Sequence, residues 1–118
     1  MTANTIESLR IELRQFVAER DWEQYHTPKN LACGVSTEAA ELLEIFLWKT
    51  PEESGDISEE ELKRVADELG DILIYLIRLS DKLQLSLLDC AHQKLSKNQT
   101  RYPPEKVRGS AKKYTEYQ

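Results

Sequence analysis

Apolar residues recur every three or four positions along most of this 118-residue chain, which is the spacing of one face of an α-helix. The pattern predicts four helices, over residues 4–19, 28–49, 58–83 and 86–100. Capping side chains stand at each start, namely Asn4 with Glu7, Thr27 before Pro28, Ser58 with Glu61, and Ser86. We therefore expect an all-α fold, a four-helix bundle, in one domain over residues 1–118, with 105–118 as an extended basic tail.

The third and fourth predicted helices differ in their apolar faces. The fourth is expected to turn one face inward, made of Leu87, Leu88, Ala91 and Leu95. The third carries a longer stripe of Leu62, Val65, Leu69, Leu76, Leu79 and Leu83. It is also apolar on every side from Ile72 to Ile77, and such a segment needs cover all round. Four helices of this size cannot supply that cover, so we expect a homo-oligomer, a tetramer in preference to a dimer, with the third helix at the interface.

Two pairs of carboxylates stand one helical turn apart in the second and third predicted helices. On a helical wheel Glu38 lies in the middle of the apolar face and Glu41 at its edge. The second pair is Glu68 and Asp71. The turn-rich stretch 50–57 would fold the two helices back antiparallel, which brings both pairs to one level within about 3 Å. A carboxylate on a core face is costly unless it is paired or binds a cation, so we expect the four to share a hard cation.

The identity of that cation follows from the ligand atoms. A di-iron site in a helical bundle uses Glu-x-x-His motifs, and neither acidic pair contains a histidine. An all-oxygen set favours Mg²⁺, with Mn²⁺ as a possible substitute, and Mg²⁺ sites commonly include substrate phosphates. The residues therefore favour a Mg²⁺-dependent hydrolase of a nucleotide phosphoanhydride. The alternative is a non-catalytic helical nucleotide-binding or interaction module, but surface decoration would not place Glu38 on an apolar face.

Composition excludes several classes of protein. The net charge of −5, from 16 basic and 21 acidic residues, argues against binding to a nucleic-acid polymer. No signal peptide and no apolar run long enough to cross a membrane are apparent, so we expect a cytoplasmic protein without membrane contact. Cys33 and Cys90 are too few for a disulfide framework and are expected to be buried free thiols.

Two clusters admit both a structural and a functional interpretation. Trp22, Tyr25 and His26 crowd the connector before the second helix, where they either plug the end of the bundle or offer a stacking surface to a flat ligand. Near the end of the fourth helix Lys94 and Arg101 are interleaved with other polar residues. This cluster is either a solvated face that balances an acidic chain or a site that neutralises phosphate near the metal.

Taken together, the motifs resemble those of the MazG-like all-α nucleoside triphosphate pyrophosphohydrolases, and most closely the dCTP pyrophosphatase branch. The similarity runs from about Phe16 to Tyr117 and is strongest in these segments: residues 19–26, Glu38-Ala-Ala-Glu41, Trp48-Lys49-Thr50, residues 68–76, Arg101-Tyr-Pro103 and Lys113-Tyr-Thr-Glu116. The resemblance implies Mg²⁺-dependent hydrolysis of a deoxynucleoside triphosphate, dCTP or a modified dCTP, to the monophosphate and pyrophosphate. The biological role would be housecleaning of the nucleotide pool, and the family assembles as dimers or tetramers.

The resemblance also assigns roles to residues. Glu38, Glu41, Glu68 and Asp71 match the metal-binding, catalytic positions. Trp22, His26, Trp48 and Tyr75 match positions that hold the nucleoside, and Lys94, Asn98, Arg101 and Tyr102 are assigned to the phosphates. The chain departs from the family at Thr37, where many members have a second glutamate, and near Leu13, where the dCTP branch has a histidine. The second departure bears on selectivity for cytosine.

Overall fold

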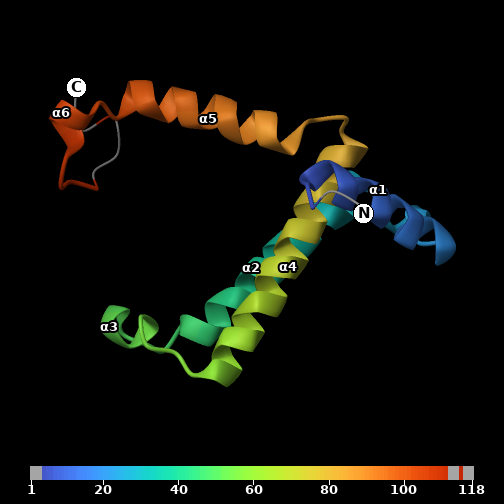
Figure 1. Cartoon of the computed structure of the whole chain (residues 1–118), viewed down its shortest axis with the longest axis horizontal. Coiled ribbons are helices and arrows are strands. Elements are labelled where there is room, and N and C mark those ends of the chain that lie inside the picture. The colour runs from blue at the N-terminus through green and yellow to red at the C-terminus, as the bar shows by residue number, and fades with distance from the viewer. Residues whose placement is uncertain (1–3, 112–114, 116–118) are drawn as a thin grey trace. The chain divides into compact units, whose positions relative to one another are not determined.

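The structure is a computed structural model that describes residues 4–111 and residue 115. In this part of the chain it contains helices and no strand (Figure 1). The elements are α1 (Ile6–Glu19), η1 (Glu23–Tyr25), α2 (Pro28–Phe46), α3 (Pro51–Ser54), α4 (Glu59–Lys82), α5 (Leu87–Arg101) and α6 (Pro104–Val107). The all-α prediction is therefore confirmed for the described residues. Nearly all of the Lys113–Glu116 motif lies outside them, as does much of the predicted tail.

The chain divides into two compact units, Met1–Gln84 and Leu85–Gln118. The first unit contains α1, η1, α2, α3 and α4, and the second contains α5 and α6. The candidate metal ligands all lie in the first unit. A four-helix bundle and a single domain, which concern both units together, stay predictions.

Most helix starts are where the local sequence predicts them. Thr27, Ser58 and Ser86 are N-caps, and the Ser58–Glu61 pair forms the expected capping box. At the first helix the predicted Asn4–Glu7 cap is wrong by one residue. Thr5 is the cap and exchanges hydrogen bonds of 3.0 Å with Ser8 in both directions. This register leaves Glu7 in the first turn, where it bonds to Arg10 one turn later.

The connection between the two long helices contains a helical turn that the pattern does not predict. The second helix ends at Phe46 rather than Lys49. Thr50 is extended because proline follows it, and it caps α3 with its side chain. The predicted extended tail likewise begins with a helical turn, α6, with Pro104 at its first position.

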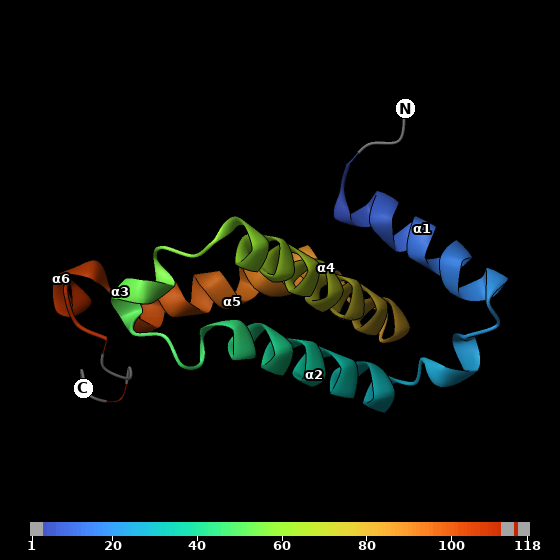
Figure 2. The same cartoon turned by 90° about the horizontal axis from the view of Figure 1, so that it is seen from below.

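The first unit is built around the antiparallel pair α2 and α4, which lie side by side in both views (Figures 1 and 2). Its buried apolar side chains come from three helices and are Leu13, Val17, Leu31, Ile45 and Ile77. Burying one such side chain stabilises the fold by about 1.5–3 kcal/mol. This core fixes the rotation of α2 and α4 about their axes, and with it the direction of the carboxylates.

Several apolar side chains that were expected to be covered are exposed in the single chain. On α4 these are Leu62, Leu69, Leu73 and Ile74. On α5, Leu88 and Leu95 of the face predicted to turn inward are each 54% exposed. The two cysteines, predicted to be buried, are exposed free thiols. No helix among the described residues is both long and apolar enough to cross a membrane.

Candidate metal centre and substrate cavity

Three of the four predicted carboxylates come together between α2 and α4. Glu38, Glu41 and Glu68 each offer one oxygen, and these three oxygens lie within 4.8 Å of one another. Glu38 and Glu68 are half-buried, whereas Glu41 is exposed. This order of burial agrees with the helical wheel, on which Glu38 is central and Glu41 marginal.

The electrostatics of this acidic cluster are unfavourable without a counter-ion. The Oε2 atoms of Glu38 and Glu68 are buried and have no hydrogen-bond partner among the described residues. The Glu68 carboxylate, followed by burial and the Glu41 carboxylate, raises the pKa of Glu38 to about 7. Ionised carboxylates are acceptors only, so these groups cannot satisfy one another.

A hard divalent cation fits this cluster. The buried oxygens without partners are acceptors that lack donors, and the three clustered ligand atoms are carboxylate oxygens, which Mg²⁺ and Mn²⁺ prefer. Asp71 is outside the group of three, but its charge contributes to the raised pKa of Glu38, and both residues line one cavity. The described residues thus bring three predicted ligands together and place the fourth beside them.

The cavity next to Glu38 and Asp71 has a volume of about 360 Å³. On the α1 side it is lined by Leu13, Phe16 and Val17, together with Glu12. The remaining lining residues come from the connector and α4: Trp22, His26, Ile74, Tyr75 and Arg78. An apolar cavity with a few polar groups and an acidic edge is the usual form of a small-molecule site.

The connector before α2 forms part of this cavity rather than only plugging the helix ends. Trp22 packs edge-on against Phe16, with ring centroids 5.7 Å apart, and is still 43% exposed. Its neighbour Tyr25 is more exposed and does not line the cavity. Trp22 therefore packs against Phe16 of α1 and also lines the cavity, so both interpretations of the aromatic cluster stay open.

The Tyr75 ring packs against a glycine, Gly34, that the sequence pattern does not mark as a site residue. A Cβ atom at Gly34 would lie 2.5 Å from Cε1 of Tyr75, far closer than two carbon atoms can approach. Gly34 is therefore required for the Tyr75 ring to lie against α2. The only sequence signal is a glycine inside an otherwise regular helix, which often marks a close approach.

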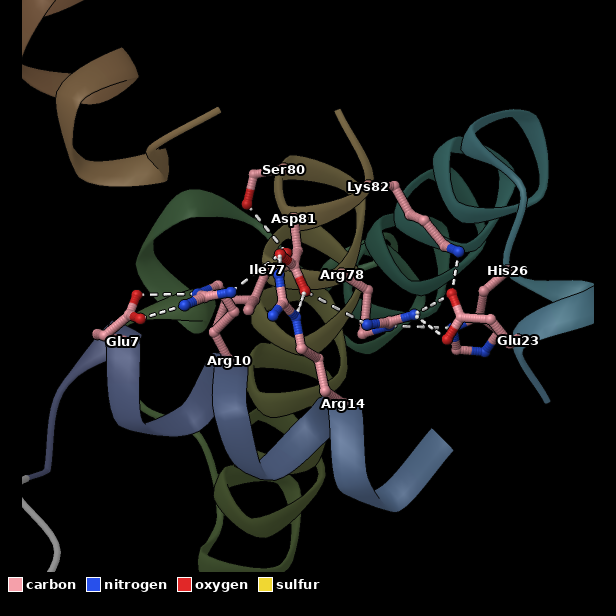
Figure 3. A network of polar contacts seen from close by, with 10 residues as sticks. All are labelled: Glu7, Arg10, Arg14, Glu23, His26, Ile77, Arg78, Ser80, Asp81 and Lys82. Carbon is pink, nitrogen blue, oxygen red and sulfur yellow. Dashed lines mark hydrogen bonds and ion pairs between the residues drawn. The ribbon is translucent and has the colours of Figure 1, made fainter. Parts of the chain in front are cut away.

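A charged network that reaches the cavity through His26 and Arg78 was also missed (Figure 3). We call it the Arg78 network and define it as Arg10, Arg14, Glu23, His26, Arg78, Asp81 and Lys82. Asp81 accepts hydrogen bonds from Arg14 at 2.6 and 2.7 Å and from Arg10 at 3.1 Å. These contacts tie α1 to the C-terminal part of α4. Hydrogen bonds of the Arg14 and Arg10 guanidinium groups hold the pKa of Asp81 below its usual value.

The other predicted substrate-binding residues are Trp48, in the same unit as this cavity, and four residues of the second unit. Trp48 is 91% exposed and does not line it. The four residues assigned to phosphate lie in the second unit: Lys94, Asn98 and Arg101 on α5, and Tyr102 as its C-cap. Lys94, Asn98 and Arg101 follow i, i+4, i+7 spacing and so share one helical face.

Comparison with known proteins agrees with this architecture. The sequence profile of the MazG-like family matches residues 34–117. The chain belongs to the MazG-like family. Among curated MazG-like relatives, dCTP pyrophosphatase 1 of Bos taurus is 43% identical over 114 residues, which cover 95% of this chain and 68% of that protein. The Homo sapiens protein of the same name is 41% identical over the same share of this chain and 67% of its own length.

A solved structure supports the fold directly. The crystal structure of a pyrophosphatase from Archaeoglobus fulgidus aligns with a TM-score of 0.80 and 39% sequence identity. The alignment covers 87% of this chain and 96% of that one. The resemblance inferred from the motifs is thus confirmed, and the acidic cluster lies within the segment that matches the MazG-like profile.

Proposed function

We propose that this protein is a Mg²⁺-dependent nucleoside triphosphate pyrophosphohydrolase of the cytoplasm that acts on dCTP or a modified dCTP. Water cleaves the bond between the α- and β-phosphates, which yields the monophosphate and pyrophosphate and removes unwanted triphosphates from the nucleotide pool. The observation that carries the proposal is the acidic cluster, in which three carboxylate oxygens lie within 4.8 Å of one another beside a 360 Å³ cavity. The dCTP pyrophosphatases at 41–43% identity support the choice of substrate.

Glu38, Glu41, Glu68 and Asp71 would hold the metal, which is Mg²⁺ with Mn²⁺ as a substitute. A bound divalent cation neutralises phosphate charge and activates water for attack on phosphorus. The protein contributes a rigid frame, because the buried core next to these residues fixes α2 against α4. Half-burial of Glu38 and Glu68 strengthens their attraction for a cation relative to a fully solvated site.

The base is proposed to occupy the cavity, with Trp22, His26 and Tyr75 around it. Trp22 offers an aromatic face, and stacking on such a face contributes about 1–3 kcal/mol per base. Trp48 would complete the clamp from another subunit, since within one chain it lies away from the cavity and is almost fully exposed. The phosphates are proposed to meet Lys94, Asn98, Arg101 and Tyr102, whose charges and donors suit phosphate oxygens.

We further propose a homo-oligomer, a tetramer in preference to a dimer, with α4 at the interface. The exposed apolar side chains Leu62, Leu69 and Leu73 on α4 support this assembly. An assembly would also offer cover to Leu88 and Leu95 of α5, which are each 54% exposed. Light scattering at micromolar concentration tests it, and a stable monomer would contradict it.

The decisive experiment is a substrate panel with metal control. The purified chain is incubated with all canonical and several 5-modified deoxynucleoside triphosphates, and pyrophosphate and phosphate are measured separately. We expect pyrophosphate from dCTP or its derivatives only when Mg²⁺ or Mn²⁺ is present, with no release of single phosphate. Binding without turnover on every substrate would favour the non-catalytic module instead.

Metal binding is tested apart from turnover by thermal unfolding. A cation at a hundredfold excess over its Kd stabilises a folded protein by about 2.7 kcal/mol. We expect Mg²⁺ to raise the melting temperature of the wild type and to have no such effect on Glu38→Gln. Equal shifts in both proteins would remove Glu38 from the metal site.

A further inference from the structure

Arg78 is a charged side chain in a nearly fully buried place. Only 2% of the residue is exposed, and burial lowers the pKa of its guanidinium. Its Nη2 donates to both carboxylate oxygens of Glu23, at 3.2 and 3.3 Å, and its Nη1 lies 3.5 Å from Asp81 (Figure 3). A buried guanidinium held this firmly from two sides has little freedom to turn.

The third nitrogen of the Arg78 guanidinium, Nε, is directed to the ring of His26. The Nε–H group donates to Nδ1 of His26 at 3.2 Å (Figure 3). A guanidinium has donors only, so Nδ1 must accept with its lone pair and carries no proton. In a neutral imidazole the proton is then on Nε2. A doubly protonated ring would set two N–H groups against each other. Burial and the Arg78 charge, which both lower the pKa of His26, oppose that state as well.

We propose that Arg78 is a positioning residue that fixes His26 with its proton on Nε2, so that the cavity wall offers an N–H donor to an acceptor on the edge of the bound base. The ligand side of this inference rests on the proposed function, whereas the state of the ring does not. Suitable acceptors are a ring nitrogen without a proton or a carbonyl oxygen, such as N3 or O2 of cytosine. A base that turns an N–H group toward His26 is disfavoured because two donors then meet in a poorly hydrated site.

The surroundings of the ring support these two roles, in which Arg78 positions the ring and His26 provides the donor. Besides Arg78, the titratable groups that line the cavity with His26 are Glu12, Glu38, Asp71 and Tyr75, and among the described residues none of these four forms a hydrogen bond with His26. Glu23, which lies on the same connector, is held by Arg78 and by Lys82. The connector is therefore anchored to α4 through Arg78, and the ring orientation and its proton position depend on the same side chain.

The state of the ring is tested by NMR on the full chain labelled with ¹⁵N-histidine, in the absence of metal and nucleotide. The chain has two histidines, and a His92→Gln variant identifies the signals of His26. We expect the proton of His26 on Nε2 and an unprotonated Nδ1 at pH 7.5. A proton on Nδ1 in the wild type would overturn the inference whatever the protein hydrolyses.

Variants connect the ring to the ligand. Arg78→Met keeps a long apolar stem and removes the donor, so we expect a mixture of both ring tautomers and a KM for dCTP raised about fivefold, with a smaller change in kcat. Arg14→Gln is the matched control, because it removes a cation of the same network that does not touch His26. It should leave the ring signals unchanged. An unchanged tautomer and KM in Arg78→Met would contradict the proposal, and so would equal ring changes in both variants.

A second pair of variants keeps the test valid should Arg78→Met fail to fold. His26→Gln carries its amide to about the position of Nε2, and His26→Asn carries it to about that of Nδ1. We expect His26→Gln to retain more dCTP affinity than His26→Asn, and the reverse order would overturn the donor assignment. If no triphosphate is hydrolysed yet the ring carries its proton on Nε2, the proposed function fails and the role of Arg78 in setting the ring stands.

Discussion

The acidic cluster and the Arg78 network both use α4, but they treat charge in opposite ways. In the cluster three carboxylates approach one another, and two of their buried oxygens have no partner. In the network, charges of opposite sign alternate. Asp81 forms ion pairs with Arg10 and Arg14, and Arg78 forms ion pairs with both Asp81 and Glu23. The protein leaves buried oxygens of the acidic cluster without partners, whereas the charges of the Arg78 network are paired with one another.

This contrast separates the acidic end of the cavity from its frame. Unpaired buried charge is costly and persists where a ligand completes it, which supports the proposal that the acidic cluster binds a metal. Paired charge between α1, the connector and α4 has no need of a ligand and serves to hold the walls in place. The two kinds of region should therefore respond differently to mutation, the first in activity and the second in stability.

The largest expected effect is on turnover. Glu68→Gln should lower kcat by about a thousandfold or more, equivalent to about 4 kcal/mol, because it removes a charged metal ligand. The same change should leave the melting temperature of the metal-free protein unchanged or higher, because repulsion with Glu38 is relieved. Steady-state kinetics at saturating Mg²⁺ and calorimetry with a chelator measure the two quantities.

The matched control for this variant is Glu44→Gln. Glu44 lies on α2 one turn beyond Glu41 but is exposed and outside the cluster. It should lose little activity. Near-normal turnover of Glu68→Gln at saturating Mg²⁺ would show that Glu68 is not a metal ligand.

In the Arg78 network the main effect should be on stability. Asp81→Asn removes the shared partner of three arginines, and we expect the free energy of unfolding to fall by about 3 kcal/mol. Urea unfolding at pH 7 measures this loss. Arg14→Gln is the milder comparison, since it leaves Asp81 with two of its three arginines.

The pH dependence gives an independent check on Asp81. Its folded pKa is below the ordinary value of 3.8, so its contribution is fully present above pH 3.8 and is lost as the pH falls through the folded pKa. The stability difference between the wild type and Asp81→Asn should therefore shrink below pH 3.8. A difference that stays constant down to pH 2 would mean that the Asp81 carboxylate is not stabilised by its arginines.

A smaller effect is expected at Gly34, which belongs to the cavity wall. Gly34→Ala places a Cβ atom where the Tyr75 ring lies, and overpacking of this kind costs about 2 kcal/mol. Thermal unfolding and the KM for dCTP should both change, because Tyr75 lines the cavity. Cys33→Ala, the neighbouring exposed position on α2, is the control and should change neither. An unaffected Gly34→Ala would show that Tyr75 can move aside without cost.

The smallest effect distinguishes the two tryptophans. Trp48→Ala should raise the KM about tenfold, or about 1.4 kcal/mol, and leave stability almost unchanged, because Trp48 packs against little in its own chain. Trp22→Ala should raise the KM and also destabilise the protein, because Trp22 packs against Phe16. Kinetics with dCTP and dTTP measure the first quantity. Unchanged KM values in both variants would remove the aromatic clamp.

Much of this fold is local and could therefore be predicted from the sequence. The caps Thr27, Ser58 and Ser86 act within three residues. The position of Glu38 on the apolar face of its helix follows from helical periodicity alone. The antiparallel hairpin then brings Glu68 to Glu38. These steps require no knowledge of distant contacts.

The missed features depend on contacts between distant residues or on competition between close alternatives. Arg78 forms hydrogen bonds with His26 and Glu23, which are 52 and 55 positions away in the sequence. The periodicity of apolar residues does not predict such a pairing. The first cap moved by one residue because Thr5 and Ser8 bond to each other as well as Asn4 and Glu7 could. The apolar face of α5 is predicted to turn inward on hydropathy alone, and hydropathy does not distinguish the core of one chain from a surface that a second copy would cover.

The short connection between α2 and α4, residues 47–58, has a consequence for how the chain folds. Closing a small loop costs little entropy, so contacts between these two helices form early relative to contacts with α1. We therefore expect Glu38 and Glu68 to meet before the rest of the unit has assembled, with their repulsion already present in the folding transition state. Divalent cations should accordingly accelerate refolding as well as slow unfolding. The cation would then assist the folding of the first unit in addition to its proposed role in the reaction.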